Sequence, residues 1–155
     1  MYDMDGVYQQ HQATSTVDVL ELCGGEGRCT TIALRRKLHA GGNLDIVTGT
    51  DLTDPFTQDE VLHYINKWQV LVVVMAPVCR PFGPWAHFNQ VANYDGWLRS
   101  YNEAAPLAKF CGRVARNQIR HKRHFIYRAA QGVNALRRDA LAGSAKHDRC
   151  CICGF

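Results

Sequence analysis

The sequence predicts an α/β domain built on a doubly wound, mostly parallel sheet. Three observations lead to this prediction. Short apolar stretches alternate with helix-forming stretches, which is the pattern of repeated β-α-β units. Val70–Met75 is continuously apolar and rich in β-branched residues, as in a central strand that helices cover on both faces. The first apolar stretch, Val17–Leu22, runs directly into a glycine-rich turn.

The first half of the chain predicts two strands and two helices. Val17–Leu22 is the first strand, and Thr30–His39 is a helix that ends at Gly41-Gly42. We expect the second strand over Leu44–Thr48, leading to Asp51. Thr57 to Glu60 matches a capping box, which predicts a helix that begins there and reaches Trp68.

The second half predicts an ordered loop, a long helix and a fourth strand. Four prolines and glycines after Val70–Met75 interrupt regular structure up to Pro84. A helix within Trp97–Arg120 follows, and His124–Tyr127 is the fourth strand, with a short basic helix beyond Val133. The inward face of the long helix is expected to carry Ala108, Cys111, Ala115, and Gln118 or Ile119.

Length and composition predict one ordinary globular domain. The chain has 155 residues, of which 46% are hydrophobic and 21% charged. Its longest apolar run, Val70–Val78, is far shorter than the roughly 20 residues of a membrane-spanning helix. We divide the chain into a polar leader (1–16), the domain (17–135) and a basic, cysteine-containing tail (136–155). The leader lacks the features of a secretory signal, so we expect an intracellular location, nuclear or cytoplasmic.

The seven cysteines are expected to be free thiols in such a location. The tail contains one Cys-x-x-Cys pair, Cys150 and Cys153, whereas a structural zinc site uses two separated pairs. We therefore expect no metal.

Charge is distributed unevenly along the chain. Residues 1–97 hold 6 Lys/Arg against 11 Asp/Glu, and residues 98–155 hold 12 against 3. A basic cluster in the second part is a candidate footprint for the phosphate backbone of a nucleic acid. The alternative is the solvated face of a helix. The cluster consists of Arg113, Arg116, Arg120, Lys122 and Arg123.

The glycine-rich turn is a candidate nucleotide site. Gly24, Gly25 and Gly27 allow close approach of the backbone to a ligand at the start of a helix. Asp51, 24 residues beyond Gly27, is placed to accept hydrogen bonds from ribose hydroxyls. This spacing suits S-adenosylmethionine and NAD, but the third glycine of the NAD fingerprint is missing. A tight turn at the glycines and a turn or cap role for Asp51 are the structural alternatives.

Two motifs resemble those of cytosine C5 DNA methyltransferases, including the related domains of retroelement-type polyproteins. In the loop Met75–Trp85, Ala76, Pro77, Cys79 and Phe82 fall on positions of that family's proline-cysteine motif. Glu21–Gly27 is similar to its cofactor loop, with Cys23 in place of a phenylalanine. The resemblance covers about residues 17–132 and implies a Rossmann-like sheet of the class I methyltransferase type, in a truncated and partly degenerate form.

The resemblance also implies roles for individual residues. S-adenosylmethionine would be bound by Glu21, Cys23, Gly25, Gly27, Asp51 and Pro77. Cys79 would be the nucleophile that adds to a cytosine, and Arg80 would join the basic cluster in binding nucleic acid, with DNA favoured over RNA. Arg128 stands where the family has a glutamate, and a guanidinium cannot donate the proton that this step requires. The alternative is therefore an inactive, methyltransferase-like nucleic-acid-binding or structural module.

Overall fold

The computed structural model describes residues 16–78, 80–83 and 85–128. Within them, the strands are β1 (Val19–Leu22), β2 (Ala40–Leu44), β3 (Val72–Met75) and β4 (His124–Tyr127). The α-helices are α2 (Arg28–Arg35), α3 (Pro55–Lys67), α4 (Ala86–Ala92) and α5 (Tyr94–Arg120). Short 3-10 helices cover Ile46–Thr48 and Arg80–Phe82. The leader, the tail and the basic helix expected beyond Val133 lie outside the described residues, apart from Thr16.

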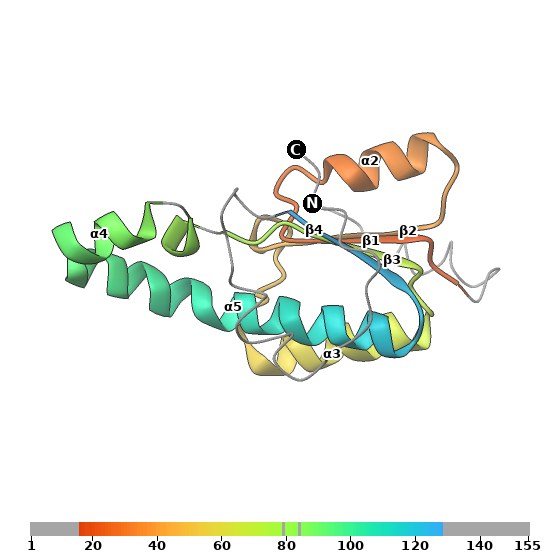
Figure 1. The fold of residues 1–155 in the computed structure, drawn as a ribbon. Helices are drawn as coiled ribbons and strands as arrows, with labels where there is room; N and C mark the ends of the chain where they lie inside the picture. Colours follow the sequence, from red (N-terminus) through yellow and green to blue (C-terminus); the bar gives the residue numbers. More distant parts are fainter. Residues whose placement is uncertain (1–15, 79, 84, 129–155) are drawn as a thin grey trace.

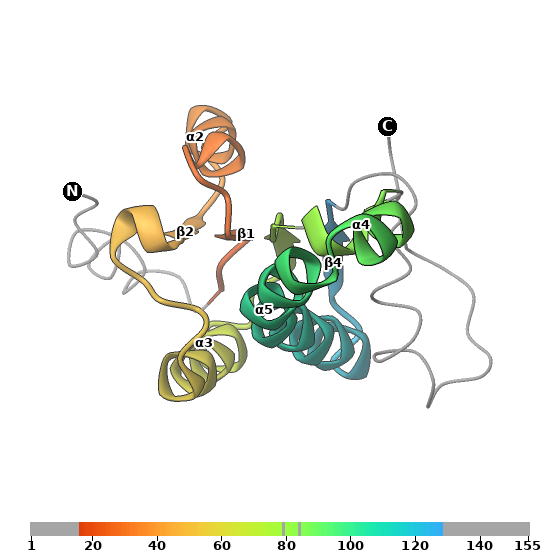
Figure 2. The ribbon, with the colours of Figure 1, turned by 90° about the vertical axis from the view of Figure 1, so that its left-hand side faces the viewer.

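The described strands form one parallel sheet in the order β2-β1-β3-β4. α2 lies on one face, and α3 and α5 lie on the other (Figures 1 and 2). The chain moves outward from β1 to β2 through α2, and outward in the opposite direction from β3 to β4 through α5. The predicted doubly wound α/β sheet is therefore confirmed over these residues.

The core lies mainly between the sheet and the α3–α5 layer. Leu20, Leu22, Val73 and Met75 are fully buried in the two central strands. α5 contributes Phe110, Cys111, Val114 and Ala115 to the same cluster, and α3 contributes Val61 and Ile65. The inward face predicted for α5 is confirmed at Cys111, Ala115 and Gln118. Ala108 is half-buried, and Ile119 is 52% exposed and faces solvent.

The second strand was predicted too late in the sequence. It spans Ala40–Leu44, whereas Ile46 and Val47 are exposed. A Cβ atom at Gly41 would lie 3.0–3.1 Å from atoms of Tyr64, Leu20 and Val17, so close packing explains a glycine inside this strand. α2 ends at Arg35, before the predicted stop at Gly41-Gly42; Arg36 is its C-cap, and Lys37 adopts a left-handed conformation.

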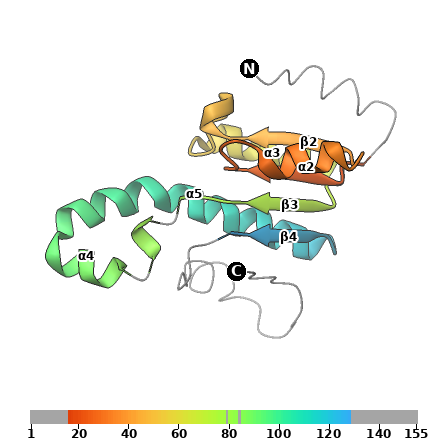
Figure 3. The same cartoon turned by 90° about the horizontal axis from the view of Figure 1, so that it is seen from above.

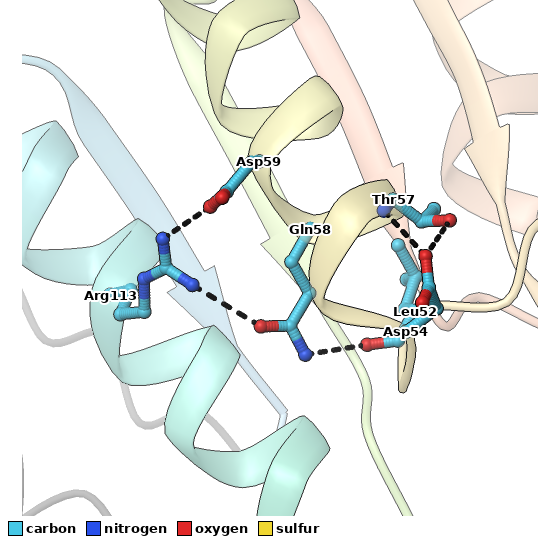
Figure 4. Close-up of polar contacts among 6 residues, drawn as sticks. All are labelled: Leu52, Asp54, Thr57, Gln58, Asp59 and Arg113. Carbon is cyan, nitrogen blue, oxygen red and sulfur yellow. Dashed lines mark hydrogen bonds and ion pairs between the residues drawn. The ribbon is translucent and has the colours of Figure 1, made fainter.

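α3 begins two residues before the predicted Thr57. The Asp54 side chain accepts hydrogen bonds from the backbone N–H and the hydroxyl of Thr57, at 2.8 and 2.9 Å (Figure 4). Pro55 occupies the first helical turn, where its fixed φ angle suits a helix and its missing N–H costs nothing. Asp54 is therefore the cap, in place of the capping box expected from Thr57 to Glu60.

The segment after β3 is more regular than the breakers predicted. It includes the 3-10 helix Arg80–Phe82 and all of α4. α4 and the first part of α5 extend beyond the carboxyl ends of the strands (Figure 3). The Tyr101 ring packs against Phe82 and Trp97, with centroid distances of 5.4 and 5.3 Å, and the Trp97 indole N–H donates to the Pro81 carbonyl at 3.2 Å. These contacts join the 3-10 helix Arg80–Phe82 to α5.

Candidate functional site

The carboxyl ends of β1 and β3 form the point at which the winding of the sheet reverses. Ligands of open α/β sheets bind at such a switch point, because the loops on either side turn away from each other. Here the loop Cys23–Gly27 follows β1, and the loop that begins at Ala76 follows β3. The Ala76 N–H donates to the Leu22 carbonyl at 3.0 Å, which places the two loops side by side.

The glycine loop has a strongly curved backbone. Cys23, Gly25 and Gly27 all have positive φ angles, between 57° and 65°. A Cβ atom at Gly25 would meet no other atom within 4 Å, so this residue faces open space. A Cβ atom at Gly24 would overlap the Glu21 carboxyl group beneath it. The absence of a side chain at Gly24 therefore allows close packing against Glu21, whereas at Gly25 it leaves the loop backbone accessible from solvent.

Two side chains at the end of β2 hold the glycine loop. The Gly24 N–H donates to Asn43 Oδ1 at 3.2 Å, and Asn43 Nδ2 donates to the Gly25 carbonyl at 2.9 Å. The Gly25 N–H donates to Asp45 Oδ2 at 3.0 Å. Neither Asn43 nor Asp45 was predicted from the sequence. Asp45 directly follows the apolar Leu44, and this was the available signal for a carboxylate at the end of the second strand.

Asp51 does not stand at the end of the second strand, as the sequence analysis expected. It is exposed, and its carboxylate accepts hydrogen bonds from the Thr53 N–H and hydroxyl at 2.9 and 2.6 Å. These hydrogen bonds lower the pKa of Asp51. Asp51 therefore organises the turn before α3. Because β2 ends at Leu44, Asp45 takes the position at the strand end that was predicted for Asp51.

Glu21 lies under the glycine loop and is 3% exposed. Its Oε2 accepts hydrogen bonds from the backbone N–H and the hydroxyl of Thr30, both at 2.9 Å. The Cys29 thiol is also hydrogen-bonded to Glu21. Glu21 therefore fixes the first turn of α2, and its negative charge at this helix N-terminus is favourable.

Cys23 is half-buried between the loop and the core. Burial raises the pKa of its thiol to about 12, and the negative charge of Asp45 adds to this effect. Such a thiol stays protonated at neutral pH, so Cys23 is a packing residue of the loop and not a nucleophile.

The loop after β3 was predicted to carry the nucleophile. Cys79 itself lies outside the described residues. Pro77 before it is buried, whereas Val78 and Arg80 on either side are exposed. The neighbouring Trp85 and Phe88 are 74% and 65% exposed.

Arg128 extends β4 at the same edge of the sheet. Its backbone N–H donates to the Met75 carbonyl at 2.8 Å, directly before the loop that contains Pro77. Burial raises the pKa of Cys29, the charge and hydrogen bond of Glu21 raise it further, and the positive charge of Arg128 opposes both. The fold thus brings the glycine loop, the loop after β3 and Arg128 together.

The basic residues are divided between two places. Arg80 lies at the carboxyl ends of the strands. The other five lie on the second half of α5 or directly after it, towards the amino ends of the strands. From Tyr101 to Arg116 is 15 residues, or about 22 Å along the helix. Arg113 and Arg123 contact α3, and Arg116, Arg120 and Lys122 are exposed.

Comparisons with protein-family models, with curated proteins and with solved structures found no match for this chain. Within residues 16–78, 80–83 and 85–128, no group of three or more His, Cys, Asp or Glu side chains is arranged to hold a metal ion. No helix of this described part is long and apolar enough to cross a membrane.

Proposed function

We propose that this chain binds S-adenosylmethionine at the carboxyl ends of β1, β2 and β3, as a methyltransferase-like domain of the cytosine-C5 type. The observation that carries the proposal is the state of the backbone donors in the glycine loop. The N–H groups of Gly24, Gly25 and Thr30 all donate to side-chain oxygens of Asn43, Asp45 and Glu21.

Backbone donors of this kind bind the pyrophosphate of a dinucleotide, and these three already donate to side chains of this protein. Two of the three acceptors are carboxylates, so the loop rests on negative charge. An anionic pyrophosphate is disfavoured there, whereas a ligand that carries a sulfonium and an ammonium group is favoured. This supports S-adenosylmethionine over NAD.

We assign Asp45 the ribose-binding role that the sequence analysis gave to Asp51. Each Asp45 oxygen accepts one hydrogen bond, Oδ1 from the Val47 N–H and Oδ2 from the Gly25 N–H. A carboxylate oxygen has capacity for a second donor, so the pair can still accept from ribose hydroxyls. Gly25, which faces open space, is where the loop backbone would approach the ligand.

The proposed reaction follows from the resemblance of the loop after β3. S-adenosylmethionine, when bound, would supply an electrophilic methyl group. Cys79 would add as a thiolate to C6 of an extruded cytosine, which makes C5 nucleophilic enough to accept that methyl group, and loss of the C5 proton would then release the thiolate. An acid that protonates N3 assists the first step, and Arg128 cannot supply this proton.

The position of Arg128 favours a second candidate function. The domain would then be a nucleic-acid-binding module that still binds S-adenosylmethionine but transfers its methyl group poorly or not at all. Arg128 lies beside the end of β3, where it can hydrogen-bond a base and add positive charge.

Calorimetric titration with S-adenosylmethionine and its demethylated product tests the cofactor site. We expect Asp45→Asn to weaken binding about tenfold or more, because one charge-assisted hydrogen bond to the ligand is lost. Asp51→Asn should change the affinity less than about twofold. Thermal unfolding of each variant verifies that it is folded. Absence of binding to the unsubstituted protein, an equal loss in both variants, or binding of NAD in its place would refute the proposal.

A methyl-transfer assay on a cytosine-containing oligonucleotide separates the enzyme from the binding module. We expect Arg128→Glu to raise the rate, because it introduces a proton donor, and Arg128→Gln to leave it low. Cys79→Ser should abolish transfer and covalent trapping on a 5-fluorocytosine oligonucleotide. Cofactor binding without transfer in any variant that retains Cys79 would establish the module.

A further inference from the structure

The second half of α5 and the facing part of α3 form the walls of an open groove of about 250 Å³, well apart from the carboxyl ends of the strands. It is lined by Leu62, Asn66, Arg113, Arg116, Asn117 and Arg120. This volume is below the roughly 300–1,000 Å³ of clefts that bury a small ligand. The groove is therefore an open surface feature, and three of its six lining residues are arginines.

Arg113 connects the two helices at one end of the groove. Its guanidinium forms an ion pair with Asp59 at 2.6 Å and donates to Gln58 Oε1 at 3.3 Å (Figure 4). Gln58 in turn donates to the Leu52 carbonyl at 3.0 Å. The Asp59 carboxylate thus compensates the charge of Arg113, and these contacts connect α5 to α3.

Arg123 and Asn117 orient Asn66 at the other end. Arg123 donates to the Ile65 carbonyl at 2.8 Å and to Asn66 Oδ1 at 2.9 Å. The Asn117 side chain donates to the same Asn66 oxygen at 2.8 Å. With its oxygen held by two donors, Asn66 has its N–H₂ group left for a ligand.

Arg116 and Arg120 supply the uncompensated charge. In the described part of the chain, neither makes an ion pair with a carboxylate. Arg113, Arg116 and Arg120 recur every three or four residues, so they share one face of α5. The row is about 10 Å long, and a stacked nucleic-acid strand carries one phosphate per roughly 3.4 Å.

We propose that this groove binds the phosphodiester backbone of a nucleic-acid strand, with Arg116 and Arg120 as phosphate ligands and Arg113 and Arg123 as positioning residues. The groove lies on the sheet face opposite α2 and towards the amino ends of the strands, away from the candidate cofactor site. It would hold a strand without presenting its bases to the loop after β3. The proposal does not depend on methyl transfer or on cofactor binding.

Fluorescence anisotropy with a labelled single-stranded oligonucleotide of about 12 thymidines, without cofactor, tests this. We expect the double variant Arg116→Gln/Arg120→Gln to weaken binding about tenfold or more at about 50 mM salt. Two lost phosphate contacts should also reduce the slope of log K against log salt by about 1.4. The matched control is Arg35→Gln/Arg36→Gln, which removes the same charge from exposed positions at the end of α2 and should weaken binding less than about twofold.

The proposal is overturned if the unsubstituted protein does not bind the oligonucleotide, or if both double variants lose the same affinity. Competition by inorganic phosphate alone, at concentrations similar to those of oligonucleotide phosphate, would also overturn it, because a single-phosphate site would then explain the groove. Loss of S-adenosylmethionine binding in a separate titration would leave this proposal unaffected.

Discussion

Glu21 binds Thr30 through one carboxylate oxygen, which accepts both the backbone N–H and the hydroxyl at 2.9 Å. The two residues connect the end of β1 to the first turn of α2 beneath the glycine loop. Both residues are buried, and the Glu21 carboxyl group packs directly beneath Gly24 of the loop.

Glu21→Gln should therefore destabilise the fold. The substitution keeps the shape but replaces a charged acceptor, and hydrogen bonds to buried charged groups contribute about 1.5–3 kcal/mol. Urea denaturation should show a loss of this size in the free energy of unfolding. Glu26→Gln is the control, because Glu26 is exposed and pairs with Arg28 at the surface, and it should change stability by less than about 0.5 kcal/mol.

Alanine at Gly24 and Gly25 should have different effects on stability. A Cβ at Gly24 overlaps the Glu21 carboxyl, so Gly24→Ala forces the buried carboxylate to move and should cost more than about 2 kcal/mol. Gly25→Ala meets open space and incurs mainly the cost of a left-handed conformation, about 1 kcal/mol. Equal losses in the two variants, measured by denaturant unfolding, would contradict the position of Glu21.

The thiols of the half-buried Cys23 and the buried Cys111 should make the fold sensitive to alkaline pH. Burial raises the pKa of Cys23 from 9.0 to about 12, and it raises the pKa of Cys111 as well. Above pH 9 the unfolded thiols ionise while the folded ones stay protonated, so the free energy of unfolding should fall between about pH 9 and 12. The contribution is fully present below pH 9.

Denaturation at several pH values checks this, with the double variant Cys23→Ala/Cys111→Ala as the comparison. Part of the decline above pH 9 should disappear in that variant. Native-state alkylation at pH 8 should in addition leave both cysteines unmodified, whereas the unfolded chain reacts. Rapid modification of Cys23 in the folded protein would contradict the raised pKa of its thiol.

The Arg113–Asp59 ion pair should contribute little to stability. Its side chains are 42% and 70% exposed, and exposed pairs contribute about 0–1 kcal/mol. A double-mutant cycle with Arg113→Ala and Asp59→Ala should give a coupling energy in that range, smaller at high salt. A coupling well above 1 kcal/mol would mean that Gln58 and the ion pair act as one network.

The sequence by itself determined the class of the fold and most of its elements. Local patterns predicted three elements to within a few residues. These patterns are the apolar stretch before the glycines for β1, the continuous apolar run for β3 and the helical period for α5. His124–Tyr127 was predicted at its observed bounds. The glycine loop was also found from sequence, because its glycines are close together.

Tertiary structure decided which carboxylate serves that loop and where the basic residues lie. Ala40–Leu44 contains two glycines and has low intrinsic strand propensity, and it is a strand because Gly41 fits against Tyr64, Leu20 and Val17 from other segments. This shift makes Asp45, and not Asp51, the residue beside Gly25. α5 connects two parallel strands, so it must run from the carboxyl end of β3 back to the amino end of β4. This direction places Arg116 and Arg120 far from Arg80.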